Sequence, residues 1–172
     1  FINANNNELV GEIGNFTNRV LTFIKKNFNG KIVGEELPLQ WKNLIRRTYA
    51  SVGNKFEEGQ FKSGVKEVFN LIKQGNDFFD KNKPWILINN NKKKCEEVLY
   101  ICAQILVALT DLMNPIIPFT CEKIKMFLGI KDTKWIFEER KSIKVNRVEF
   151  LFDKIDKKAS IEELNRLKNK KI

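Results

Sequence analysis

Apolar residues recur at helical spacing along most of the chain. Between positions 7 and 27 they follow steps of four, three, four, three and one residues, so they line one side of a helix. These residues are Leu9, Ile13, Phe16, Val20, Phe23 and Ile24. Asn29-Gly30 follows, a pair that favours the left-handed backbone found at helix ends. The pattern therefore predicts a first helix over residues 7–27.

Four more stretches are predicted to be helical. Three of them share the amphipathic spacing and are bounded by proline or glycine, and they cover residues 38–58, 61–82 and 118–129. The fourth, residues 92–113, is apolar on most sides between Val98 and Leu109. A helix of that kind is typical of the middle of a bundle.

The C-terminal part of the chain is less regular. Residues 131–156 include β-leaning pieces at 135–137 and 148–152, so we expect a loop with extended segments that packs back on the bundle. Ser160 begins a last predicted helix, Ser160–Lys170, because acidic residues follow in its first turn and lysines lie at its end. No internal repeat or long linker occurs. The prediction is one all-α domain over residues 1–172, a bundle of about five to six helices with residues 131–172 as an irregular, partly extended segment.

Composition agrees with a folded, water-soluble domain. Of the 172 residues, 42% are hydrophobic and 30% are charged. The longest apolar run, Val98 to Leu109, is shorter than the roughly 20 residues that cross a bilayer, and no secretory leader pattern opens the chain. We therefore expect no membrane contact and a cytoplasmic location. The chain begins with Phe1 instead of Met, so we expect it to be a piece of a longer protein.

The chain contains no histidine, which excludes several kinds of active site. Ser-His-Asp and Cys-His nucleophilic sites, imidazole acid–base catalysis and histidine-ligated metals all require that residue. The three cysteines are odd in number and lack Cys-x-x-Cys spacing, so neither disulfides nor a thiolate metal site is expected. We predict no catalytic residue and no metal ligand in this chain.

Positive charge is concentrated in two regions. The formal net charge is +10, and residues 61–94 and 131–172 each carry +5, whereas residues 95–130 carry −2. The first basic region ends in Lys92-Lys93-Lys94 and includes Lys81 and Lys83 beside Pro84-Trp85. Lysines beside an exposed aromatic ring are typical of single-stranded nucleic-acid binding, because phosphates supply affinity while bases stack. A solvated surface in a lysine-rich protein would give the same charge count, and both interpretations remain open at this point.

The first predicted helix also has a polar face. Asn15, Asn18, Arg19 and Thr22 follow one another at helical spacing, about a quarter turn from the apolar side. Gly11 and Gly14 lie beside this face, although glycine inside a helix costs about 1 kcal/mol relative to alanine. We expect either another helix or a ligand to approach there. Asparagine and arginine are side chains that can read base edges.

A second group of candidates lies at the end of the third predicted helix. Asn76 falls on the stripe that also carries Ile72 and Phe79, so we expect it to be buried and tied to a neighbouring backbone. Trp85 follows Pro84 where the helix ends, so its ring would be presented from a rigid corner. The pattern leaves open whether this ring belongs to the core or forms an exposed stacking surface.

Four segments together resemble the anticodon-binding helical domain of methionyl-tRNA synthetases. The first runs from Gly14 to Ile24, and the second joins Asn76 and Phe79 to Pro84-Trp85. The third runs from Asn114 through two prolines to Ile124 and on to Leu128-Gly129, and the fourth is 151–156, Leu-Phe-Asp-Lys-Ile-Asp. They occur in the family's order and span essentially the whole chain.

The resemblance implies roles for individual residues. Asn15 and Arg19 match helix positions that contact the first base of the CAU anticodon, a cytosine. Trp85 matches the tryptophan that stacks on the anticodon, with Asn76, Phe79 and Pro84 supporting that corner. Asn18, from the shared helix face, is a further supporting candidate. Local charge adds candidates for phosphate contacts, which are Lys26, Lys81, Lys83, Lys92 and Lys93.

The catalytic motifs of that family are missing from this chain. Neither the His-Ile-Gly-His nor the Lys-Met-Ser-Lys-Ser sequence occurs, and no glycine-rich phosphate loop is present. The resemblance therefore implies a domain that binds tRNA(Met) without aminoacylating it and without a cofactor of its own. The parent protein would carry a catalytic domain that uses ATP and Mg²⁺. Two alternatives remain at this stage: the equivalent domain of a leucine, valine or isoleucine enzyme, and a basic helical module that binds proteins.

Overall fold

The computed structural model describes residues 5–153, 155 and 165–166. Within them the chain forms one π-helix, six α-helices and a two-stranded sheet, which confirms the predicted helical bundle. The elements follow in the order η1 (Asn5–Gly14), α2 (Asn15–Asn27), β1 (Lys31–Val33), α3 (Leu39–Glu57), α4 (Phe61–Asn82), α5 (Pro84–Asn90), α6 (Lys92–Leu112), α7 (Pro118–Leu128) and β2 (Ser142–Lys144).

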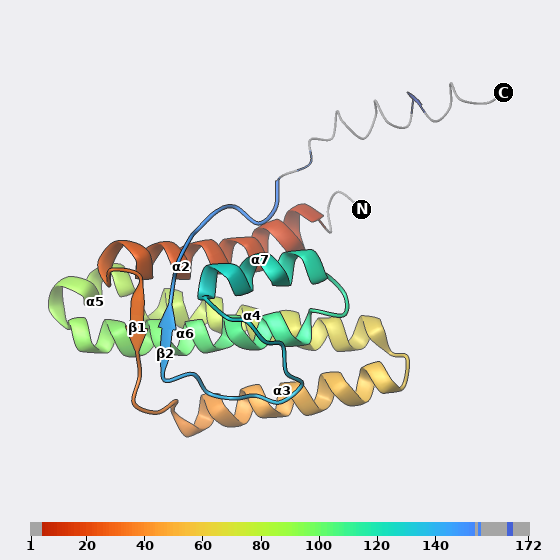
Figure 1. Cartoon of the computed structure of the whole chain (residues 1–172), viewed down its shortest axis with the longest axis horizontal. Helices are drawn as coiled ribbons and strands as arrows, with labels where there is room; N and C mark the ends of the chain where they lie inside the picture. Colours follow the sequence, from red (N-terminus) through yellow and green to blue (C-terminus); the bar gives the residue numbers. More distant parts are fainter. Residues whose placement is uncertain (1–4, 154, 156–164, 167–172) are drawn as a thin grey trace.

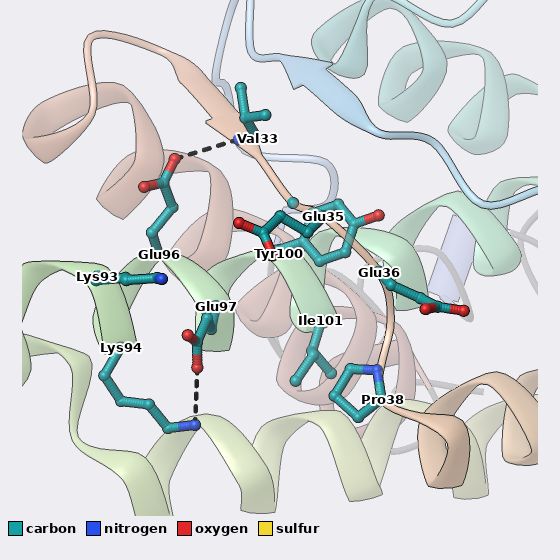
Figure 2. Close-up of a pocket in the computed structure, with 11 residues that line it drawn as sticks. Val33, Glu35, Glu36, Pro38, Lys93, Lys94, Glu96, Glu97, Tyr100 and Ile101 are labelled. Carbon is teal, nitrogen blue, oxygen red and sulfur yellow. Dashed lines mark hydrogen bonds and ion pairs between the residues drawn. The ribbon is translucent and has the colours of Figure 1, made fainter.

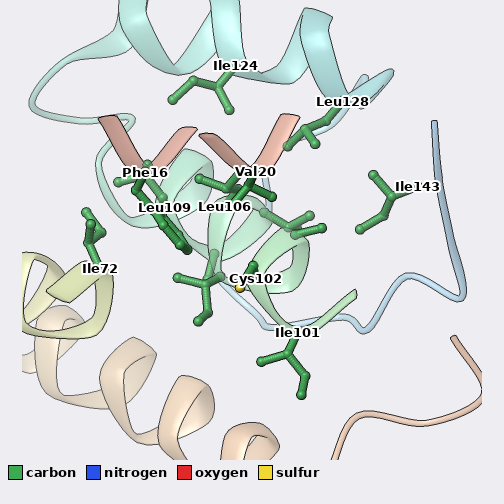
Figure 3. Packing of buried hydrophobic residues seen from close by; sticks show 14 of the residues in the cluster. Phe16, Val20, Ile72, Ile101, Cys102, Leu106, Leu109, Ile124, Leu128 and Ile143 are labelled. Atoms are coloured by element: carbon green, nitrogen blue, oxygen red, sulfur yellow. The ribbon is translucent and has the colours of Figure 1, made fainter. Parts of the chain in front are cut away.

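Helix α6 is the centre of the bundle. It contacts α2, α3, α4, α5, α7 and β1, and Figure 1 shows it passing through the middle of the molecule. Every residue from Val98 to Leu112 is buried, as its apolar sequence predicts. Figure 3 shows Leu106 and Leu109 of α6 next to Phe16 and Val20 of α2. Burial on all sides of this one helix holds the outer helices in place.

The predicted helix over residues 7–27 divides into two elements. Residues 5–14 form the π-helix η1, and regular α-helix begins only at Asn15. A Cβ at Gly11 or Gly14 would lie 3.2 Å from the carbonyl oxygen five residues earlier, so glycine relieves crowding inside the wider turn. Helix α4 contacts η1, and the ring of Phe152 lies next to Gly14, 3.3 Å from that Cβ position.

The boundaries of α3, α4, α6 and α7 agree closely with the predicted helices. Pro84–Asn90, which lies between two predicted helices and was assigned to neither, forms the short helix α5. Lys83 adopts left-handed backbone, with φ 47° and ψ 63°, and so ends α4 and turns the chain before Pro84 starts α5. The corner that carries Trp85 is therefore helical on both sides.

The predicted extended pieces at 135–137 and 148–152 are not strands. The sheet forms instead between Lys31–Val33 and Ser142–Lys144, antiparallel, with Ile32 opposite Ile143. Both isoleucines are buried, whereas their neighbours in each strand point to solvent. The pairing joins segments more than a hundred residues apart, and no local pattern in the sequence indicates it.

Polar side chains of the bundle hold the segment after α7 in place. Gln104, fully buried in α6, donates to the carbonyl of Arg140 (2.7 Å) and accepts from its backbone N–H (3.2 Å). Tyr49 donates to Asp111 across 2.6 Å, and Asp111 also accepts from the backbone of Lys134. These bonds satisfy groups that would otherwise be buried without partners. The predicted final helix, Ser160–Lys170, lies outside the described residues except for Asn165 and Arg166, which are helical.

Candidate nucleic-acid interface

Helix α2, the end of α4 and the start of α5 bring three candidate residues into one row. The guanidinium carbon of Arg19 lies 4.6 Å from the ring centre of Phe79, the stacked arrangement of a cation on an aromatic face. The ring of Phe79 lies 6.1 Å from that of Trp85, tilted by 45°. Phe79 is only 3% exposed, so the Arg19 guanidinium and the exposed Trp85 ring lie on either side of a buried ring.

Two side chains of α4 orient Arg19. Its Nη1 donates to Oδ1 of Asn76 (3.5 Å) and to Oδ2 of Asp80 (3.3 Å), while Nη2 pairs with Oδ1 of Asp80. Asn76 is half-buried and binds the Arg19 side chain, so the prediction that it ties α4 to a neighbouring backbone is wrong. The hydrogen bonds from Arg19 lower the pKa of the Asp80 carboxyl. Both partners are therefore charged at neutral pH.

Asp80 is a functional candidate that the sequence analysis missed. It lies one helical turn after Asn76, on the same face of α4, and that spacing was the available signal. The residue type gave no such indication, because a carboxylate repels phosphate. Only the packing of α4 against α2 brings the Asp80 carboxylate to the Arg19 guanidinium.

Trp85 lies on the outside of the bundle, with 46% of its surface exposed. The ring therefore does not belong to the core, and its role as a stacking surface stays a prediction. Pro84 beside it is buried, and its carbonyl accepts from the thiol of Cys95. The turn is thereby fixed to α6 while the indole faces solvent.

A shallow pocket of about 470 Å³ occupies this surface. Arg19, Phe79 and Trp85 line it together with Asn18 and Lys26. Asn15 is exposed one turn before Arg19 on the same face of α2, outside the lining of the pocket. The sequence candidates thus lie in one region, with Asn15 at its edge.

The lysine candidates are divided among several surfaces. Lys26 lines the pocket, and Lys81 and Lys83 are exposed at the end of α4. Lys92 lies over the ring of Phe28, 5.6 Å from its centre. Lys93 lines a different cavity, beside β1 and the first turns of α6.

Four glutamates and two lysines are among the residues that line this cavity of about 370 Å³ beside β1 (Figure 2). Glu96 accepts from the backbone of Val33 across 3.3 Å, and Glu97 pairs with Lys94 at 2.9 Å. Glu35 and Glu36 line it as well. Four carboxylates oppose phosphate binding, so Lys93 faces an unsuitable environment for the contact that the sequence suggested.

Other chemistry is sparse in the part of the chain that the structure describes. There, histidine, cysteine, aspartate and glutamate form no group of three that could hold a metal ion. The three cysteines are buried as free thiols, and burial raises the pKa of Cys95 to about 11. Within the same residues no helix has the length and apolar character needed to cross a membrane.

Comparison with known proteins identifies the family of this fold. A family model described as the anticodon binding domain of methionyl tRNA ligase matches residues 30–169. The chain belongs to this family. A methionine–tRNA ligase of Streptococcus pneumoniae (strain CGSP14) is 38% identical over 164 residues, which cover 95% of this chain and 30% of that protein. Methionine–tRNA ligase 1 of Alkaliphilus oremlandii is 34% identical over 168 residues, which cover 97% of the chain and 31% of the relative.

Solved structures show the same fold. The free-state Mycobacterium tuberculosis methionyl-tRNA synthetase has a TM-score of 0.82 and 17% identity, over 90% of this chain and 34% of that one. The same enzyme in complex with methionyl-adenylate has a TM-score of 0.79 and 18% identity, over 87% of this chain and 32% of that one. The chain spans about a third of the length of the relatives it matches. The family predicted from the four sequence motifs is confirmed, and the leucine, valine and isoleucine enzymes are not the source of this anticodon-binding domain.

Proposed function

We propose that the chain binds the CAU anticodon loop of tRNA(Met) as one domain of a methionine–tRNA ligase. The observation that carries this proposal is the row in which the buried ring of Phe79 supports the Arg19 guanidinium beside the exposed ring of Trp85. Such a row offers a base both a flat surface and a fork of hydrogen-bond donors. Single-stranded RNA loops are recognised by those two contacts.

In this proposal Trp85 stacks on an unstacked anticodon base. Arg19 and Asn15 read the edge of the cytosine, because guanidinium donors match its O2 and N3 acceptors and an amide can accept from its amino group. Asn76 and Asp80 hold the guanidinium in the plane needed for that contact. Phe79 supports Arg19 from below, Pro84 fixes the corner, and Asn18 adds a polar group beside it.

Phosphate contacts come from the lysines that surround the row. Lys26 lines the pocket, and Lys81 and Lys83 lie within two residues of Phe79 and Trp85, respectively, in the sequence. Lys92 lies over the ring of Phe28, and Lys93 lines the cavity beside β1. Three contacts to a single strand predict that affinity falls roughly 20-fold between about 50 and 200 mM salt.

The parent protein, in this proposal, attaches methionine to the acceptor end of the same tRNA in the cytoplasm. Its catalytic domain uses ATP and Mg²⁺ and corresponds to the part of the relatives that this chain does not cover. The anticodon-binding domain itself uses no cofactor. The methionyl-adenylate in the Mycobacterium tuberculosis relative supports ATP-dependent activation of the amino acid.

Binding of labelled RNA stem-loops to the 172-residue chain tests the proposal. Fluorescence anisotropy should give tighter binding to a CAU loop than to loops in which the first anticodon base is uracil, adenine or guanine. Affinity should fall steeply as salt is raised. Equal, salt-insensitive binding to all loops, or none at millimolar RNA, would contradict anticodon recognition and favour a module that binds proteins.

A further inference from the structure

Helix α2 separates two shallow pockets that share one wall. The pocket beside Trp85 is lined in part by Asn18, Thr22 and Lys26, and the same three residues line a second pocket of about 500 Å³ on the other side of the helix. These residues form a ridge along α2. A strand of nucleotides that lies on the ridge therefore reaches both pockets.

The far wall of the second pocket is the segment after β2. Val148, Glu149 and Phe150 line it, and Phe150 is 80% exposed. The charge of Glu149 is balanced by its ion pair with Arg147. Phe150 is thus a large aromatic ring that faces solvent across the ridge from Trp85.

The segment is fixed to the bundle on both sides of Phe150. Before it, the backbone N–H of Asn146 donates to Phe127 across 2.8 Å, and Lys25 of α2 donates to the carbonyl of Asn146 across 2.9 Å. After it, Leu151 is buried and the Phe152 ring packs on Gly14. Phe150 is therefore held in position by its neighbours while its own ring remains uncovered.

The ridge between the two rings offers polar contacts that suit a nucleic-acid backbone. Lys26 is exposed, and among the described residues no carboxylate pairs with it. Thr22 donates to Oδ1 of Asn18 across 3.3 Å, a bond that does not use the Asn18 amide N–H groups. A ligand with a phosphate at Lys26 and a flat apolar group on each side of it would fill both pockets.

We propose that Phe150 is a second base-stacking surface, which takes another nucleotide of the same RNA loop while Lys26 contacts the phosphate between them. This inference rests on the proposed anticodon recognition and extends it across α2. It assigns the pocket lined by Val148, Glu149 and Phe150 to an unpaired base of the RNA loop. Because stacking tolerates any base, we expect Phe150 to add affinity and little sequence preference.

The test compares Phe150→Ala with two matched variants in the 172-residue chain. Loss of one stacked base predicts that Phe150→Ala weakens binding of the CAU stem-loop about 5- to 150-fold. Phe150→Trp should retain the affinity, because it keeps a flat ring. Phe119→Ala removes an equally exposed ring on α7, away from both pockets, and should change nothing. Thermal unfolding checks that the variants fold.

The adenosine analogue 2-aminopurine, placed at one loop position after another, locates the contact. In the complex with Phe150→Ala, the fluorescence of 2-aminopurine should rise at one loop position. In the complex with Trp85→Ala, it should rise at a different loop position. If the wild type binds and Trp85→Ala weakens it, but Phe150→Ala binds normally, the second surface is refuted and the proposed function stands. If the wild-type chain binds no RNA loop, both proposals fail.

Discussion

Gly75 of α4 lies in close contact with side chains of α2 and α6. A Cβ at this position of α4 would lie 2.7 Å from Cζ of Phe16 and 3.1 Å from Cδ1 of Ile105. Phe16 and Ile105 are both fully buried, so neither has open space to move into. The change Gly75→Ala must therefore push α4 away from α2 by several tenths of an ångström.

Two opposing effects set the size of the change. Overpacking a buried contact costs about 1–3 kcal/mol, whereas alanine gains about 1 kcal/mol over glycine in a helix. The net loss of unfolding free energy is about 0–2 kcal/mol. For a chain of this size that corresponds to a fall in Tm of up to about 8 °C. The shift also moves Asn76 and Asp80 away from Arg19, so binding of the CAU loop should weaken as well.

Thermal unfolding followed by circular dichroism measures the first effect, and anisotropy measures the second. Asn70→Ala is the control, because Asn70 is exposed on the same helix and gains helix propensity without a new contact. Its Tm should stay the same or rise slightly. Phe16→Leu removes the ring edge and should reduce the cost of Gly75→Ala in the double variant. A Gly75→Ala chain as stable as Asn70→Ala would refute the argument from close packing.

Three further predictions concern the site and the core. Trp85→Ala should weaken CAU stem-loop binding about 5- to 150-fold through loss of stacking, whereas Ile86→Ala, equally exposed, should not; anisotropy decides. Arg19→Lys keeps the charge but loses the fork, so the preference for cytosine over uracil should fall more than total affinity; equal losses would exclude edge recognition. Arg19 lowers the pKa of Asp80, so their pairing stabilises the fold at pH values above the unfolded-state pKa of about 3.9. This stabilisation is lost as the pH falls through the lower pKa of the folded state. Below that pH, the Tm difference between the wild type and Asp80→Asn should vanish.

A fourth prediction tests the buried bond between α3 and α6. Tyr49→Phe removes the hydroxyl that donates to Asp111 and leaves a buried carboxylate oxygen without that donor. Unfolding free energy should fall by about 1–3 kcal/mol, as measured in a denaturant titration. Thr22→Val, at an exposed position of α2, should change it much less.

Most helices could be predicted because their hydrogen bonds are local. The ends of α4 and α7 follow from Lys83-Pro84 and Gly129, whose backbone preferences act within a few residues. The division of residues 5–27 into η1 and α2 was not predicted. Apolar spacing does not distinguish a π-helix from an α-helix here, because residues four apart, such as Leu9 and Ile13, lie on nearly the same side in both.

The candidate site could be predicted only in part. Motif resemblance pointed to Arg19, Asn76, Phe79 and Trp85, and all four lie in one region. It did not indicate Asp80, which pairs with an arginine 61 positions away, or the choice of Arg19 as the partner of Asn76. Those pairings depend on the distance and rotation between two helices, which packing against α6 sets.

The sequence by itself determined that this chain is a helical bundle of the methionyl-tRNA ligase anticodon-binding family, because periodicity, capping residues and motifs are local properties. Only the tertiary structure decided that Ile32 pairs opposite Ile143, that Phe152 covers Gly14, and that Trp85 and Phe150 face solvent on opposite sides of α2. The physical reason is burial. Which side chain is covered depends on what packs across from it, and that neighbour comes from a distant part of the chain.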